Sequence, residues 1–264
     1  MTTRVRGIFF DVDFTLIYPG PTFQAEGYAA FCAKHRIDID RSRFGAAVAG
    51  ASAILDEEQD HVYTADIFVR YTRRVIEGMG GRGEALDACA REIYDEWAAC
   101  GHFFLYEDVA PALRELAARG FRLGLISNSH RCLVSFQQHF ELTGLIAAAV
   151  SSAEHGYMKP HPSIFEAALA QAGLNAGESL MVGDSMAHDI EGARRAGMRG
   201  VLVHRSGPPL PDAPDVPVVT NLGELLKIVQ EPQPFAIREA SSGRARPADA
   251  GADGTPSGQR RGWC

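Results

Sequence analysis

The 264-residue sequence has no long hydrophobic run and no long basic run. No apolar stretch approaches the roughly 20 residues that a membrane-spanning helix needs, so we expect no membrane partner. The net charge is −7, which argues against nucleic acid as a partner. Hydrophobic residues make up 46% of the chain, so the composition favours an ordinary globular protein with a real core.

Cysteine is scarce: the chain has five, an odd number, and no Cys-x-x-Cys pair. Scattered cysteines of this kind are typical of reduced thiols in a cytoplasmic protein rather than of a disulfide framework. The apolar run near the N-terminus ends in Asp11 and Asp13, which argues against the hydrophobic region of a signal peptide. We therefore predict a cytoplasmic protein. The sequence leaves the oligomeric state open.

Short apolar runs alternate with amphipathic segments through much of the chain. This alternation predicts an α/β fold in which a parallel sheet carries helices on both faces. The expected strands are residues 5–10, 122–126, 146–150, 180–182 and 200–203. The expected helices are residues 109–119, 132–140, 162–172, 188–196 and 222–229.

Residues 21–102 break this pattern, because they are helical in texture and almost devoid of strand runs. Amphipathic spacing predicts helices over 22–34, 60–77 and 85–99. The pattern therefore predicts that this segment is an insertion into an α/β domain made of residues 1–20 and 103–230. Residues 231–264 are rich in Pro, Gly, Ala, Ser and Arg, and we expect them to form a disordered tail.

Two acids, Asp11 and Asp13, stand at the carboxyl end of the first expected strand, where open α/β sheets place their ligands. Two carboxylates at this spacing suit phosphoryl transfer, because one can attack phosphorus while the other handles the leaving-group proton. An Asp-rich turn that caps the next element would give the same pattern. The pair alone does not decide between these interpretations.

Polar residues also follow the next three expected strands. Ser127 and Asn128 could bind phosphoryl oxygens through a hydroxyl and backbone amides, or Ser127 could cap a helix. Lys159 lies in a connection, where most lysines are simply solvated. Asp184, with Asp189 after it, could coordinate a hard cation such as Mg²⁺ or stabilise a helix N-terminus.

Taken in order, the segments DVDFT, ISN, KP and GDSMAHDIEGARRAG resemble the four motifs of the haloacid dehalogenase-like (HAD) hydrolase superfamily. The run SSAEHGYMKPHPSIFEAALAQAGL is also similar to the family's usual sequence around its lysine. The resemblance covers roughly residues 4–229. It implies a Rossmann-like, doubly wound parallel sheet core. Residues 21–102 would then form an inserted α-helical cap domain that closes over the site.

The resemblance implies catalytic roles for three residues. Asp11 corresponds to the nucleophile that forms an aspartyl-phosphate. Asp13 corresponds to the acid that protonates the leaving oxygen and later activates water. Lys159 corresponds to the cation that neutralises the nucleophile and the transferring oxygens.

The same resemblance implies binding roles for the remaining motif residues. Ser127 and Asn128 correspond to the phosphate-binding hydroxyl and the amide beside it, together with Lys159. Asp184 corresponds to the metal-binding acid, which would hold Mg²⁺ together with Asp11 and the backbone carbonyl of Asp13. Asp189 corresponds to an outer acid that holds the metal waters or the lysine.

Phe14 departs from the family pattern, which commonly has glycine after the second acid. A positive φ at this position would strain a phenylalanine. Because the family varies here, we expect that no positive φ is needed and that Phe14 packs below the cap.

The activity implied is Mg²⁺-dependent hydrolysis of a small phosphorylated metabolite. Asp13 separates this from a dehalogenase, which has no acid at that position because halide needs no proton. Lys34 is the only cap lysine, which weakens the case for a phosphonatase with a Schiff-base lysine in its cap. A phosphomutase shares both acids and stays an alternative. A non-catalytic regulatory protein is another, although its expected loss of a nucleophile or metal acid is not seen.

Overall fold

The structure of the protein is a computed structural model that describes residues 4–56, 60–205 and 215–229. Its centre is a six-stranded sheet in the order β5-β4-β1-β6-β7-β8, and all neighbouring strands in it run parallel. The strands are β1 (Gly7–Phe10), β4 (Arg122–Ser127), β5 (Ile146–Ser151), β6 (Ser179–Gly183), β7 (Arg199–Val203) and β8 (Val218–Val219). The five strands expected from the sequence are present, and the short β8 joins them at one edge.

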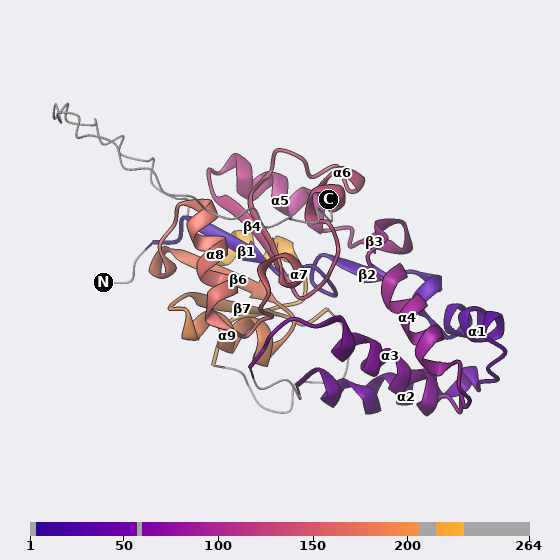
Figure 1. Ribbon diagram of the computed structural model, residues 1–264. Coiled ribbons are helices and arrows are strands. Elements are labelled where there is room, and N and C mark those ends of the chain that lie inside the picture. The colour runs from indigo at the N-terminus through magenta and orange to yellow at the C-terminus, as the bar shows by residue number, and fades with distance from the viewer. Residues whose placement is uncertain (1–3, 57–59, 206–214, 230–264) are drawn as a thin grey trace, which may run out of the picture.

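Strand β1 lies in the middle of the sheet, between β4 and β6 (Figure 1). The chain builds β4 and β5 on one side of it, then crosses back to build β6, β7 and β8 on the other. The strand order therefore reverses at β1, which is where open α/β sheets bind their ligands. All four residues of β1 are buried, as expected for a parallel strand covered on both faces.

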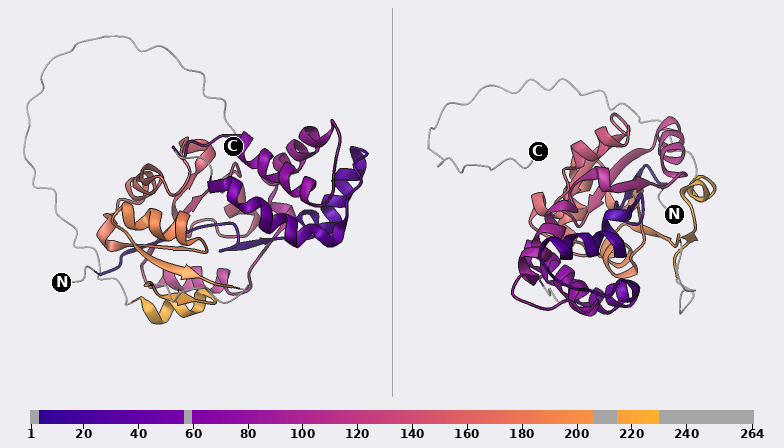
Figure 2. Two further views of the ribbon diagram at one scale, coloured as in Figure 1. Left: turned by 90° about the horizontal axis from the view of Figure 1, so that it is seen from below. Right: turned by 90° about the vertical axis from the view of Figure 1, so that its right-hand side faces the viewer.

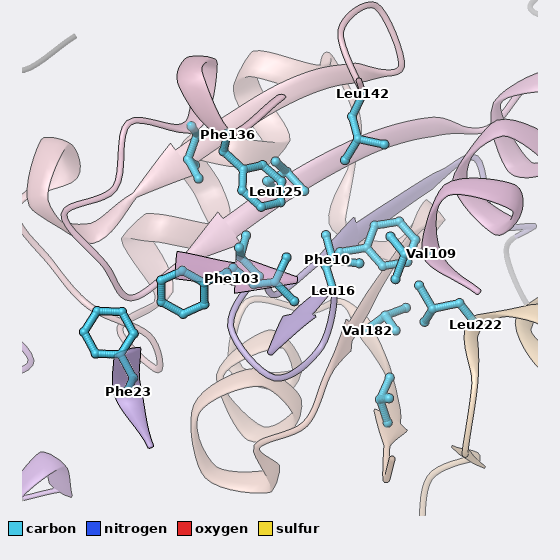
Figure 3. Packing of buried hydrophobic residues seen from close by; sticks show 14 of the residues in the cluster. Phe10, Leu16, Phe23, Phe103, Val109, Leu125, Phe136, Leu142, Val182 and Leu222 are labelled. Atoms are coloured by element: carbon cyan, nitrogen blue, oxygen red, sulfur yellow. The ribbon is translucent and has the colours of Figure 1, made fainter. Parts of the chain in front are cut away.

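Helices cover both faces of the sheet, because successive strand residues point to opposite sides. Phe10, Leu125 and Val182 belong to one apolar cluster, and Figure 3 shows them packed beside Val109 and Phe136. Phe9 and other strand residues join a second cluster with α8 and α9. The helices of this part of the chain are α5 (Val109–Ala118), α6 (Leu133–His139), α7 (Ser152–His155), α8 (Pro162–Ala172), α9 (Glu191–Arg195) and α10 (Leu225–Ile228). The predicted α/β, doubly wound fold is thus confirmed.

The helical insertion leaves and rejoins the core through a pair of short antiparallel strands, β2 (Ile17–Pro19) and β3 (Phe103–Leu105). Its helices are α1 (Ala25–Lys34), α2 (Phe44–Ala51), α3 (Ala65–Gly78) and α4 (Leu86–Glu96). They gather beside one end of the sheet rather than over its faces (Figure 1, Figure 2). Apolar residues of this segment and of the core form one continuous cluster. We refer to this segment below as the cap; its bounds at residues 21 and 102 stay a prediction.

The helix expected over residues 188–196 consists of two different elements. A π-helical turn, Met186–Ile190, precedes α9. The Ser185 hydroxyl accepts a hydrogen bond from the backbone N–H of His188 at 3.1 Å. Turns of this kind are frequent at functional sites, and here one carries the fully buried Asp189.

Other sequence expectations meet the structure in part. Cys32, Cys89 and Cys100 carry free thiols, as expected, whereas Cys132 is disulfide-bonded, which corrects the expectation there. Among the described residues, no helix is both long enough and apolar enough to cross a membrane. The predicted disordered tail, residues 231–264, lies outside the described residues.

Gly124 of β4 is a position where the core leaves no space for a side chain. It pairs with Phe9 of β1, and a Cβ atom at Gly124 would lie 2.4 Å from the Phe9 ring. We predict that Gly124→Ala lowers the free energy of unfolding by about 1–3 kcal/mol, because the buried ring must move. Urea unfolding followed by circular dichroism measures this change.

The matched control is Gly45→Ala, which lies on an exposed face of helix α2 with open space around it. There an added methyl group should leave the stability unchanged or raise it by up to about 1 kcal/mol. Equal destabilisation by both substitutions would contradict the packing argument.

Candidate active site

The polar residues singled out in the sequence meet at the carboxyl edge of the sheet. Asp11 directly follows β1, Ser127 ends β4 and Asp184 directly follows β6. Lys159 lies beyond β5 and α7. Because the strands are parallel, their carboxyl ends share one edge, and side chains far apart in sequence come within contact of one another.

A single buried lysine links two of the acids. The Lys159 Nζ donates hydrogen bonds to Asp11 Oδ1 at 2.5 Å and to Asp189 Oδ1 at 2.6 Å. All three side chains are nearly inaccessible to solvent. Burial alone would lower the pKa of Lys159, but the two carboxylates outweigh it and raise that pKa above its usual range. The lysine is therefore a permanent cation at the centre of the site.

Asn128 holds the backbone of Lys159 in place. Its side-chain oxygen accepts from the Lys159 N–H at 2.7 Å, and its side-chain nitrogen donates to the Lys159 carbonyl at 2.9 Å. The Asn128 side chain is thus committed to this reciprocal pair. A phosphate contact from Asn128 would have to come from its backbone N–H. Ser127 is fully buried, and its hydroxyl lies 2.8 Å from the hydroxyl of Ser129.

Three acids form a cluster that could hold a cation. One carboxylate oxygen from each of Asp11, Asp184 and Asp189 lies within 4.8 Å of the others. Asp184 accepts from the Thr15 hydroxyl at 3.4 Å. Both oxygens of Asp189 are already used, one by Lys159 and the other by the backbone N–H of Ser185 at 3.0 Å.

The electrostatics of the cluster favour a positive ion. Burial raises the pKa of Asp11 well above its usual range, and the charge of Lys159 offsets this only in part. The Asp184 carboxylate is exposed at the surface, yet loss of water on its protein side and the charge of Asp189 raise its pKa to about 6. Loss of water is the main cause of both pKa shifts, and the negative charges of the neighbouring acids add to it.

The Asp13 carboxylate is turned toward Arg131, which the sequence analysis missed. Arg131 Nη1 donates to both oxygens of Asp13 at 3.0 Å. The Arg131 side chain is fully buried, and no local pattern in the sequence signals this burial. The sequence places Arg131 four residues after Ser127, and only this closeness to a motif residue indicates a position near the site.

The cap lies against the loops that carry these residues. The backbone carbonyl of His61, in the cap, accepts a hydrogen bond from the backbone N–H of Met158 at 2.7 Å, next to Lys159. The Tyr94 ring stacks on His130 with centroids 4.1 Å apart. Burial lowers the pKa of His130. The cap therefore forms part of the surroundings of this edge of the sheet.

A family model described as haloacid dehalogenase-like hydrolase matches residues 5–197. The chain belongs to this family. The resemblance of the four motifs is thereby confirmed, and the match spans both the carboxyl edge of the sheet and the cap.

Known relatives agree with this assignment. Phosphoserine phosphatase of Thermus thermophilus is 30% identical over 164 residues, which cover 60% of this chain and 62% of that protein. N-acylneuraminate-9-phosphatase of Homo sapiens is 29% identical over 247 residues, which cover 86% of this chain and 95% of that protein. The magnesium-bound crystal structure of the HAD-hydrolase YfnB from Bacillus subtilis shares the fold, with a TM-score of 0.65 at 18% identity, over 86% of this chain and 99% of that one. Several other curated relatives are matched over 43% to 50% of their length.

Phe14, where the family commonly has glycine, adopts a positive φ of 65°. The expectation that this position needs no positive φ is therefore wrong. The chain reverses tightly here, since Phe14 donates to the Ile17 carbonyl at 2.7 Å and Leu16 donates to the Val12 carbonyl at 2.9 Å. The Phe14 ring lies 6.5 Å from that of Trp97 but stays 47% exposed, so it packs below the cap only in part.

Loss of the lysine should destabilise the fold. We predict that Lys159→Met lowers the free energy of unfolding by about 3–5 kcal/mol in the presence of EDTA, because two buried carboxylates lose their shared cation. Adding Asp189→Asn to the same chain should recover part of this loss. Chemical denaturation of both variants measures the effect.

Lys227→Met is the surface control, since Lys227 is exposed. It should change the stability by no more than about 0.5 kcal/mol. A Lys159→Met protein as stable as the wild type would show that the lysine does not balance the acids.

Proposed function

We propose that the protein is a phosphatase that hydrolyses a small phosphorylated metabolite through an aspartyl-phosphate on Asp11, with Mg²⁺ as cofactor. The observation that carries this proposal is the ion pair of Asp11 with the buried Lys159. A carboxylate with its own fixed cation, at a sheet edge and two residues before a second acid, is equipped to attack a phosphorus atom.

The reaction would proceed in two balanced steps. An Asp11 oxygen bonds to phosphorus while the bond from phosphorus to the ester oxygen breaks, and Asp13 gives a proton to the departing oxygen. Asp13, now a carboxylate, then takes a proton from the water that attacks phosphorus and releases Asp11. Lys159 and the Ser127 hydroxyl would stabilise the oxygens of the phosphoryl group during both transfers.

The donor set at the edge fits a hard divalent cation. Carboxylate and carbonyl oxygens are the ligands that Mg²⁺ prefers. Asp11, Asp184 and the backbone carbonyl of Asp13 would hold the ion. Asp189, whose two oxygens are occupied, would orient the lysine instead. When bound, the cation would neutralise charge on the phosphoryl oxygens.

The alternatives have less support. A dehalogenase does not need the acid at position 13, and a non-catalytic protein does not need the set of Asp11, Lys159 and Asp184 to be complete. The relatives' names point to phosphatases with differing substrates, among them phosphoserine phosphatase and glyceraldehyde 3-phosphate phosphatase. We therefore propose the substrate class, a small organic phosphate, and no single compound.

Substitution of the two acids tests the covalent mechanism. With Mg²⁺ and p-nitrophenyl phosphate, Asp11→Asn should abolish turnover, because no attacking oxygen remains. Asp13→Asn should slow the hydrolysis of alkyl phosphates by roughly 10²–10⁴-fold, because the leaving oxygen lacks its proton donor. Mass spectrometry of acid-quenched Asp13→Asn protein should reveal one added phosphoryl group on Asp11, since its release also needs Asp13.

Asp38→Asn is the matched control, because Asp38 is an exposed acid of the cap. It should keep wild-type turnover. Substantial hydrolysis by the Asp11→Asn protein, or a phosphoryl group on another residue, would contradict the proposal.

Metal binding can be tested apart from activity. We predict that Mg²⁺ raises the melting temperature of the wild-type protein. At a Mg²⁺ concentration one hundred times Kd, binding should add about 2.7 kcal/mol to the free energy of unfolding. Asp184→Asn should abolish this response, whereas Asp189→Asn should keep most of it. EDTA should remove both the stabilisation and the activity. Equal loss in the two variants would place Asp189 among the direct ligands, against the proposal.

A further inference from the structure

Arg131 is the largest fully buried side chain in the described part of the chain, and it borders the proposed catalytic acid. Its Nη1 atom is bonded to both oxygens of Asp13 at 3.0 Å. Its Nη2 atom donates to the carbonyl of Trp97 at 2.8 Å. Its guanidinium lies over the Phe103 ring, 4.3 Å from the centroid. Three separate segments of the chain therefore fix one guanidinium plane.

Two of these contacts come from the two ends of the connection between cap and core. Trp97 directly follows helix α4 of the cap, and Phe103 begins β3, where the chain re-enters the core. Arg131 itself lies between β4 and α6, in the core. The guanidinium thus bridges the root of the cap and the Asp13 carboxylate.

The burial of the Arg131 guanidinium carries a free-energy cost that its contacts must offset. Burial of a guanidinium is costly unless good hydrogen bonds compensate it, and here Arg131 Nε is buried without a partner. The contacts of Arg131 with Trp97 and Phe103 could fasten the end of the cap, here called the cap root (residues 97–103), to the core. For that purpose any nearby carboxylate would serve as the partner of the guanidinium. Instead the partner is the one carboxylate that must move protons in the proposed reaction.

We propose that Arg131 is a positioning residue that acts through Asp13: it holds the Asp13 carboxyl group in one orientation beside the leaving oxygen of the substrate. This inference rests on the proposed function, because it requires Asp13 to be the acid and base. The Trp97 carbonyl and the Phe103 ring fix the guanidinium in one place, and its Nη1 atom contacts both Asp13 oxygens from that place. A flexible lysine side chain has no such additional contacts to fix its position.

The choice of leaving group separates this role from a structural one. Cleavage of an alkyl phosphate needs a proton on the departing oxygen, whereas p-nitrophenolate departs without one. The measured quantity is kcat/KM for glycerol 2-phosphate divided by kcat/KM for p-nitrophenyl phosphate. This ratio cancels the amount of folded enzyme, so partial misfolding of a variant does not affect it.

Arg131→Met should lower the ratio by about 10²-fold, as expected for a misplaced catalytic group. Arg131→Lys, which keeps the charge but loses the second nitrogen that bonds the Trp97 carbonyl, should lower it by a smaller factor. In an Asp13→Asn background, Arg131→Met should cause no further change in the ratio, because the two residues act as a unit. An unchanged or increased ratio in Arg131→Met would overturn the inference.

Arg205 supplies a matched control. It is largely buried, with 9% of its side chain exposed, and its guanidinium lies 3.8 Å from the centroid of the Tyr106 ring. It donates hydrogen bonds to the Asp108 carboxylate and to the backbone carbonyl of Thr15. Arg205→Met should leave the ratio unchanged even if it lowers both rates. An equal fall in the ratio for both arginines would assign the effect to general loss of packing and overturn the inference.

The same data distinguish failure of this inference from failure of the proposed function. If Asp13→Asn itself leaves the ratio unchanged, Asp13 is not the proton donor, and the proposed function fails. If Asp13→Asn lowers the ratio while Arg131→Met does not, the proposed function stands and only the role of Arg131 is refuted.

Discussion

One buried cation between two buried carboxylates is the interaction on which the site depends. Lys159 meets Asp11 from the end of β1 and Asp189 from the π-helical turn after β6. Three elements far apart in sequence must therefore be placed to within hydrogen-bond distance. The Asn128 side chain and the Ser185 N–H serve this placement, since each fixes one member of the group. Because Asp184 adds a third acid and the lysine supplies one positive charge, the cluster as a whole remains negative.

The parallel sheet explains why these groups can meet at all. With β1 between β4 and β6, the residues after three adjacent strands share one edge. Register keeps them level: Phe10, the residue before Asp11, pairs with both Leu125 and Val182. Helices on both faces bury the middle of the strands, where the residues are mostly apolar, so the polar residues of the site begin where the strands end.

Much of this was predictable from the sequence, and the failures have physical causes. Strand runs and strand-end acids are local patterns, so the sheet and positions such as Asp11 and Asp184 could be found. The strands β2 and β3 were missed because each has three residues and pairs across the whole cap. The positive φ of Phe14 follows from hydrogen bonds within a tight turn, which composition does not reveal. Burial of Arg131 depends on Trp97 and Phe103, which only the folded chain brings beside it.

The site divides into a part held by the core and a part that also contacts the cap. Asp11, Lys159 and Asp189 bind one another and are anchored by core elements. Asp13 differs, because its partner Arg131 is also hydrogen-bonded to the carbonyl of Trp97, at the end of a cap helix. A displacement of Trp97 would change that bond and with it the support of Asp13, while the pair of Asp11 and Lys159 could stay intact. In the proposed reaction, the position of the cap would therefore affect proton transfer by Asp13 more directly than attack by Asp11.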